Sequence, residues 1–177
     1  MISASARTTT VAINAWFADQ PTAGSGQYIS RLLPQLRALT PQWQFAAIAP
    51  DVRSAARRLL GENLYKIWFE QVVFPRRALR SGAHLAHVPY WASPVRNRCP
   101  TAVTIHDVIP LILSPYQKRW RVRAYTRLVS ASARRADLVI TVSEASKRDI
   151  VERLGLPPDK VRVTYEAAAP EYRPQSA

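Results

Sequence analysis

Two short segments of the chain contain residue types that could do chemistry. The first contains Gly24, Ser25, Gly26 and Gln27 and lies between a predicted strand and a predicted helix. Glycines let the backbone approach a ligand closely, and the free N–H groups and dipole of a helix start favour a phosphate. The segment is neither a complete G-x-G-x-x-G motif nor a Walker loop, and an ordinary strand-to-helix turn would explain it equally well.

The second segment is His106-Asp107, which follows a predicted strand at 101–105. A histidine at that position could donate a hydrogen bond to a sugar hydroxyl or take part in proton transfer. Asp107 could orient the histidine or cap the next turn. A buried structural His–Asp pair is the alternative interpretation.

Two further loops follow predicted strands. Tyr90 and Trp91 come after the strand predicted at 84–88, and their rings could stack on the apolar face of a sugar or simply pack. Ser143 and Glu144 come after the strand predicted at 137–142. Ser143 is a good N-cap and Glu144 suits a first helical turn, so capping is their main predicted role.

The charge balance is strongly basic. The 25 Lys and Arg against 12 Asp and Glu give a formal charge of +13, which favours polyanionic partners: nucleic acid, anionic lipid head groups or phosphate-bearing substrates. Arg119, Arg123 and Arg127 are spaced at i, i+4 and i+8, so they share one face of a predicted helix. That face is either a membrane-facing surface, where each charge contributes about 1 kcal/mol, or a solvated charged face.

The elements that position these residues alternate along the chain. Short apolar strands are predicted at 10–14, 45–49, 84–88, 101–105, 137–142 and 161–164. Helices are predicted from Tyr28 to Leu39, at 53–60, at 64–79 with an interruption at Pro75, at 115–135, and from a Ser143 cap to Gly155. We therefore predict an α/β fold: a Rossmann-like, doubly wound parallel sheet with helices on both faces. Ligands of such sheets bind beyond the carboxyl ends of the strands.

Composition limits the remaining possibilities. We expect a frayed start at 1–9, one domain at 10–166 and a linker at 167–177. The chain has one cysteine, Cys99, which we interpret as a packed or idle thiol, and no Cys/His cluster with zinc spacing, so we expect no metal and no cofactor. No apolar run is long enough to span a bilayer and no secretion signal is recognisable, so a cytoplasmic location is expected.

Three segments together resemble one enzyme family. They are residues 24–28, the strand and loop Val103–Pro110 that contains His106-Asp107, and the strand and helix start Ala136–Ile150, which continues to Gly155 and Val161. In order and spacing they are similar to the N-terminal domain of the retaining glycosyltransferases of the GT-B fold, in the group 1 or GT4 family. The resemblance covers nearly the whole chain, from about Val11 to Pro174.

The resemblance implies a function and a set of roles. The family moves a hexose from a nucleoside-diphosphate sugar to an acceptor with retained anomeric configuration, the nucleotide-sugar being a substrate rather than a cofactor. Residues 24–27 would face the donor diphosphate, and His106 with Asp107 would be catalytic. Tyr28, Tyr90, Trp91 and Val108 would border the acceptor, which is often polysaccharide or lipid-linked. The wording around His106 most resembles members that build bacterial surface polysaccharides, often from mannose donors.

The resemblance also implies a second, donor-binding domain that these residues do not include. We therefore expect the 177 residues to fold but not to turn over sugar nucleotide, because the charge on the leaving diphosphate would not be stabilised. Two other interpretations stay open. One is a basic nucleic-acid-binding module, although the transferase interpretation expects no nucleic-acid partner. The other is a small nucleotide-binding domain acting alone.

Overall fold

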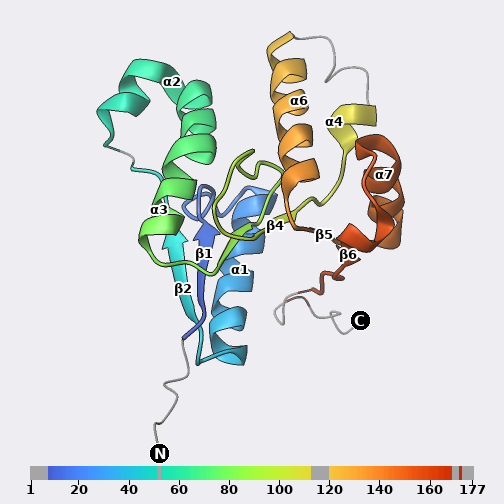
Figure 1. The fold of residues 1–177 in the computed structure, drawn as a ribbon, viewed down its shortest axis with the longest axis horizontal. Coiled ribbons are helices and arrows are strands. Elements are labelled where there is room, and N and C mark those ends of the chain that lie inside the picture. Colours follow the sequence, from blue (N-terminus) through green and yellow to red (C-terminus); the bar gives the residue numbers. More distant parts are fainter. Residues whose placement is uncertain (1–7, 52, 113–119, 169–171, 173–177) are drawn as a thin grey trace, which may run out of the picture.

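A single parallel sheet organises the molecule (Figure 1). The computed structural model describes residues 8–51, 53–112, 120–168 and 172. In this part of the chain six parallel strands pair in the order β2-β1-β3-β4-β5-β6. They are β1 (Thr10–Asn14), β2 (Gln44–Ile48), β3 (Leu85–Val88), β4 (Thr101–Thr104), β5 (Leu138–Thr141) and β6 (Val161–Val163). The predicted α/β fold with a Rossmann-like parallel sheet is confirmed.

Helices connect most of the strands. Along the described residues they are α1 (Gly24–Leu39), α2 (Ala55–Trp68), the π-helix η1 (Phe69–Val73), α3 (Phe74–Arg80), α4 (Ile109–Ile112), α6 (Trp120–Arg135), α7 (Glu144–Leu154) and the 3₁₀ turn η2 (Pro158–Lys160). The connection from β3 to β4 is different, because residues 89–100 run from the carboxyl end of β3 back to the amino end of β4 without a helix.

The two faces of the sheet pack against different helices. On one face Val11 and Ile13 pack with Ile29 of α1. Ala12, which points the opposite way, belongs to the larger core that includes Phe69 of η1 and Val129 of α6. Every residue of β1 is buried, as expected for a parallel strand covered on both sides.

The segment from α2 to α3 is less regular than a pair of helices. Gly61, at φ 73°, breaks α2, which agrees with a break between the predicted helices at 53–60 and 64–79. Pro75 lies in the first turn of α3, which continues directly from η1. The irregularity lies just before it, in η1. Such π-helical turns are often found at functional sites.

The predicted ends of α7 are confirmed. The Ser143 side chain accepts a hydrogen bond from the Ser146 backbone N–H at 3.0 Å, and Gly155 ends the helix at φ 62°. A left-handed backbone of this kind favours glycine. This capped helix fixes where the chain leaves β5.

Two predictions about composition can be compared with the described residues. Among them, no helix combines the length and the apolar character needed to cross a bilayer. The same residues contain no group of three or more His, Cys, Asp or Glu side chains that could hold a metal ion. The frayed start at 1–9 and the linker at 167–177 lie mostly outside the described residues, so the domain boundaries stay predictions.

Candidate active site

The segment that begins α1 and the histidine after β4 meet at the carboxyl edge of the sheet. The rings of Tyr28 and His106 lie 4.9 Å apart, centroid to centroid, at 88° to one another. β1 and β4 are separated by β3 in the sheet, so this contact brings together segments that are about eighty residues apart in the sequence. Tyr28 of α1 and His106 therefore lie side by side, and a wall shared by residues 24–27 and His106 stays a prediction.

The two glycines at the start of α1 have different tasks. A Cβ on Gly26 would lie 2.0 Å from the backbone oxygen of Gln20 and 2.8 Å from that of Phe17, so the fold itself requires glycine there. A Cβ on Gly24 would meet no atom within 4 Å. No side chain caps the helix start at Ala23, and its first turn contains no acidic residue. The first N–H groups of α1 therefore have no intrahelical hydrogen-bond partner, and the neighbouring position at Gly24 is open.

His106 has a carboxylate partner, but the partner is not Asp107. His106 Nδ1 lies 3.2 Å from Oε1 of Glu166, in the segment after β6. His106 Nε2 is buried and has no hydrogen-bond partner among the described residues. Asp107 Oδ1 instead accepts a hydrogen bond from the Ile109 N–H at 3.0 Å, so of its two predicted roles the structure has the cap of the next turn.

The residues expected to border the acceptor are mostly packed. Tyr90 is 5% exposed and Val108 is 1% exposed. Trp91 is partly buried and donates its Nε1–H to the Val129 carbonyl at 3.2 Å. Tyr28 is partly buried, and burial raises the pKa of its hydroxyl. Packing, the alternative for Tyr90 and Trp91, describes their present contacts, and contact of these four residues with an acceptor stays a prediction.

Comparison with known proteins identifies the family of the chain. Residues 24–171 match the family model described as Glycosyltransferase Family 4. The chain belongs to glycosyltransferase family 4. Family 4 proteins are transferases that act on a sugar donor and an acceptor.

One relative of this family 4 domain has a more specific name. The chain is 31% identical over 111 residues to the O-antigen chain mannosyltransferase B of Escherichia coli. The matched region is 60% of this chain but only 29% of the length of the E. coli protein. Because the relative is distant and is matched over only part of its length, the activity of the whole protein to which this domain belongs can only be proposed.

A buried charged cluster of the family 4 domain escaped the sequence analysis. Glu70 of η1 is 0% exposed and accepts hydrogen bonds from the Lys66 ammonium and the Tyr125 hydroxyl. Lys66 Nζ also donates to the Tyr125 hydroxyl oxygen at 2.6 Å, and it lies 5.7, 5.1 and 4.9 Å from the ring centres of Phe17, Tyr90 and Tyr125. Burial raises the pKa of the Glu70 carboxyl, and Lys66 opposes that rise.

The cluster lies near the same edge of the sheet as the wall. Phe17 follows β1 and Tyr90 follows β3, and their rings contact each other at 4.9 Å. The sequence contained one signal for it: Lys66 and Glu70 are spaced at i and i+4 inside an otherwise apolar segment. A charged residue in such a segment is almost never fully buried unless it is paired.

The crossing loop 89–100 is held from both sides. Gln71 of η1 donates its Nε2–H to the Ser93 carbonyl at 3.2 Å and accepts the Val95 N–H at 2.9 Å. Trp91 is bonded to α6 on the other side, as described above. In Figure 1 this loop lies between α3 and α6. The π-helical turn thus contributes both the buried carboxylate of Glu70 and the Gln71 side chain, which holds the loop that contains Tyr90.

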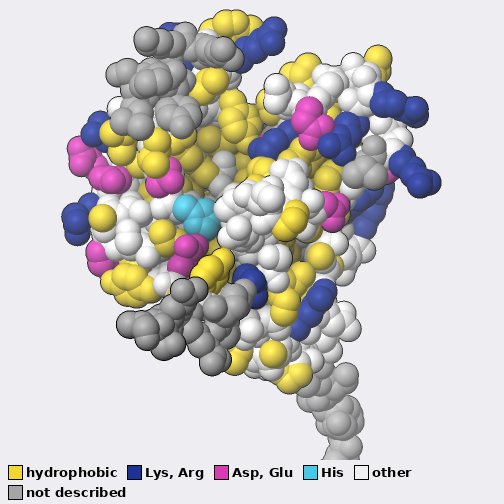
Figure 2. Space-filling model, turned by 180° about the vertical axis from the view of Figure 1, so that it is seen from behind, with side chains coloured by type: hydrophobic (Ala, Val, Ile, Leu, Met, Phe, Trp, Pro, Cys, Tyr) yellow, Lys and Arg dark blue, Asp and Glu magenta, His cyan; other side chains and the backbone are white. Residues whose placement is uncertain are grey.

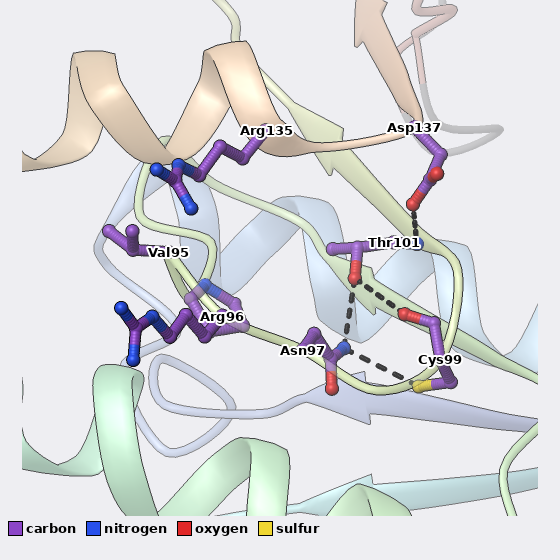
Figure 3. A pocket seen from close by; sticks show the side chains of 8 residues that line it. Val95, Arg96, Asn97, Cys99, Thr101, Arg135 and Asp137 are labelled. Atoms are coloured by element: carbon purple, nitrogen blue, oxygen red, sulfur yellow. Dashed lines mark hydrogen bonds between the residues drawn. The ribbon is translucent and has the colours of Figure 1, made fainter.

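A pocket at the opposite edge of the sheet is not part of this site (Figure 3). Its lining includes Asn97, Cys99, Thr101 and Asp137, near the beginnings of β4 and β5. Asp137 accepts the Thr101 N–H at 2.7 Å, and Asn97 donates to Thr101 Oγ1 at 2.8 Å and to Cys99 Sγ at 3.4 Å. These contacts join the crossing loop to β4. Burial raises the pKa of the Cys99 thiol, which suits a packed thiol.

The surface between α2 and α6 is hollow and partly apolar. Figure 2 shows a depression with hydrophobic side chains between the lobe of α6 and α7 and the lobe of α2. α2 leaves Leu64 59% exposed and Trp68 37% exposed. On α6, Arg123 and Arg127 are exposed, as predicted for a charged face, whereas Arg119 lies outside the described residues.

Proposed function

We propose that this chain is the acceptor-side, N-terminal domain of a hexosyltransferase. In this proposal the whole protein moves a hexose from a nucleoside-diphosphate sugar to a polysaccharide or lipid-linked acceptor, with retention of anomeric configuration. The observation that carries the proposal is the contact between Tyr28 and His106, because it brings a free helix start and a polar ring to one wall beyond the strand ends.

The start of α1 is suited to the donor diphosphate. Its first N–H groups have no side-chain cap, and the positive end of the helix dipole favours negative charge. The open position at Gly24 leaves room for a phosphate oxygen, while no carboxylate in the first turn would repel it. Ser25 and Gln27 follow in the same turn and would add side-chain donors.

His106 is suited to the hexose, whose hydroxyls can hydrogen-bond to an imidazole nitrogen. Its ring contacts the ring of Tyr28, which directly follows residues 24–27. A nucleotide-sugar bound along the wall would therefore place its diphosphate at residues 24–27 and its hexose at His106. Asp107 supports this role indirectly by capping α4 behind the histidine.

The acceptor and the cellular location rest on weaker support. The O-antigen relative favours mannose as the sugar and a polysaccharide as the product. The hydrophobic depression between α2 and α6 would receive the acceptor, and the exposed arginines of α6 would face anionic lipid at the cytoplasmic surface of a membrane.

A transfer assay tests the proposal. The 177-residue chain, alone and fused ahead of the donor-binding domain of a family 4 mannosyltransferase, is incubated with GDP-mannose or UDP-hexoses and a membrane extract as acceptor source. We expect transfer only by the fusion and loss of that transfer with His106→Ala. Transfer that His106→Ala leaves unchanged, or no transfer by a correctly folded fusion with any donor, would count against the proposal.

A further inference from the structure

We propose that Glu166 is a positioning residue for His106 and fixes which ring nitrogen carries the proton. The proposal rests on the transferase function proposed above, but its geometry does not. The Glu166 carboxylate lies 3.2 Å from His106 Nδ1, and the two side chains are 51% and 28% exposed. Neither residue is near the other in sequence.

The sheet brings Glu166 to the histidine. β4, β5 and β6 are neighbours, and adjacent strands lie about 4.8 Å apart, so the ends of β4 and β6 are separated by about 10 Å. The Thr164 N–H donates to the Thr141 carbonyl at 2.8 Å, which extends the pairing of β6 by one residue. Glu166 and His106 then reach toward each other across the end of β5.

The chemistry of the pair fixes the tautomer. An ionised carboxylate has only lone pairs to present, so at 3.2 Å it would repel the lone pair of an unprotonated Nδ1 and favours the tautomer in which His106 Nδ1 carries the proton. In the neutral ring the lone pair is then on Nε2, which no described residue bonds. The edge contact with the Tyr28 ring limits rotation of the imidazole from another side. Glu166 and Tyr28 together therefore set both tautomer and orientation.

No nearer carboxylate competes for this role among the described residues. Asp107 Oδ1 is bonded to the Ile109 N–H and makes no ion pair with the ring. A carboxylate beside one ring nitrogen orients the imidazole and selects its tautomer, as outer-shell carboxylates do for metal-binding histidines. Because Glu166 lies beyond the last strand, movement of residues 164–168 would release His106 from this tautomer.

The tautomer is measured directly by long-range ¹H–¹⁵N NMR of the 177-residue chain labelled with ¹⁵N-histidine, at a pH where His106 is neutral. In the wild type we expect a protonated Nδ1 and an unprotonated Nε2. Glu166→Ala should shift the ring toward the Nε2–H form that free imidazole side chains prefer in water. Glu166→Gln, whose carbonyl oxygen can still accept, should keep the wild-type tautomer in large part.

Glu152→Ala, on the exposed side of α7, is the matched control and should change nothing. An Nε2–H tautomer in the wild type, or a wild-type tautomer in Glu166→Ala, would overturn the proposal. In the fusion used for the transfer assay, Glu166→Ala should lower kcat by about 10- to 100-fold, the range known for carboxylates that orient metal-binding histidines, with Glu166→Gln less affected.

The two experiments separate the two proposals. A fusion that never transfers sugar would reject the proposed function while the tautomer result still decides the role of Glu166. A transferring fusion whose His106 tautomer and kcat ignore Glu166 would reject only the positioning role.

Discussion

Replacing Lys66 with methionine is the sharpest test of the buried cluster. Lys66→Met keeps an unbranched side chain of similar length among the rings of Phe17, Tyr90 and Tyr125 but removes the ammonium that pairs with Glu70. Glu70 is 0% exposed, so its carboxylate would remain in the core without a cation. Breaking a buried ion pair in this way typically costs about 3–5 kcal/mol.

The cost has a ceiling, because the carboxylate can accept a proton instead. Protonating a group with an ordinary pKa of 4.5 at pH 7 costs about 3.4 kcal/mol, at about 1.36 kcal/mol for each pH unit. At pH 5 the same step costs about 0.7 kcal/mol. We therefore expect Lys66→Met to lose about 3 kcal/mol of unfolding free energy at pH 7 and about 1 kcal/mol at pH 5.

The direction follows from the raised pKa of Glu70. The folded protein holds this proton more tightly than the unfolded chain, so the associated stability is present below the ordinary pKa and is lost as pH rises through the folded-state pKa. Without Lys66 the folded-state pKa rises further, and the loss extends to higher pH.

Urea unfolding followed by tryptophan fluorescence and circular dichroism at both pH values measures these losses. The wild type is measured at each pH, so that only differences are compared. Lys66→Met/Glu70→Gln should recover much of the loss at pH 7, since its core holds no unpaired charge. Lys147→Met on α7 controls for removal of a lysine elsewhere. A loss that is equal at pH 5 and pH 7, or below about 1 kcal/mol at pH 7, would refute the reasoning.

Three other predictions test the elements that position the wall. Gly26→Ala should destabilise the fold by about 1–3 kcal/mol or more, because the new Cβ would overlap the preceding turn. Gly24→Ala should leave the melting temperature nearly unchanged, and equal effects of the two substitutions would contradict the different roles of these glycines. Ser143→Ala should cost about 1 kcal/mol in urea unfolding through loss of the α7 cap, and no loss would mean that the cap is not needed. Replacing both Arg123 and Arg127 with glutamine should weaken co-sedimentation with anionic liposomes by about 30-fold, at about 1 kcal/mol for each charge. Equal recovery of the wild type with anionic and neutral liposomes would reject the proposal that this face of α6 binds a membrane.

The fold was predictable because its signals are local. Short runs of apolar, β-branched residues such as 10–14 and 101–105 lie between helical patterns, and this alternation indicates a parallel sheet with covered faces. The cap at Ser143 and the stop at Gly155 could be predicted for the same reason, since each depends on neighbours within one helical turn.

The partners in the site could not be predicted, because they depend on strand order. Glu166 reaches His106 only because β6 lies two strands from β4, and nothing in the sequence around Glu166 indicates this. Glu70 and Tyr125 are 55 residues apart and meet because η1 and α6 flank the same loop. The burial of Tyr90 follows from that cluster, whereas its sequence context was equally compatible with an exposed ring.

An NMR titration with GDP and with UDP tests most directly whether residues 24–27 and His106 form one donor-binding wall. We predict that the amide signals of Gly24, Ser25 and Gly26 and the ring signals of His106 shift together and give a single, weak Kd in the isolated chain. Matched amounts of sodium chloride alone should not shift these signals. Shifts confined to the arginines of α6, or separate binding curves for the glycine segment and His106, would contradict it.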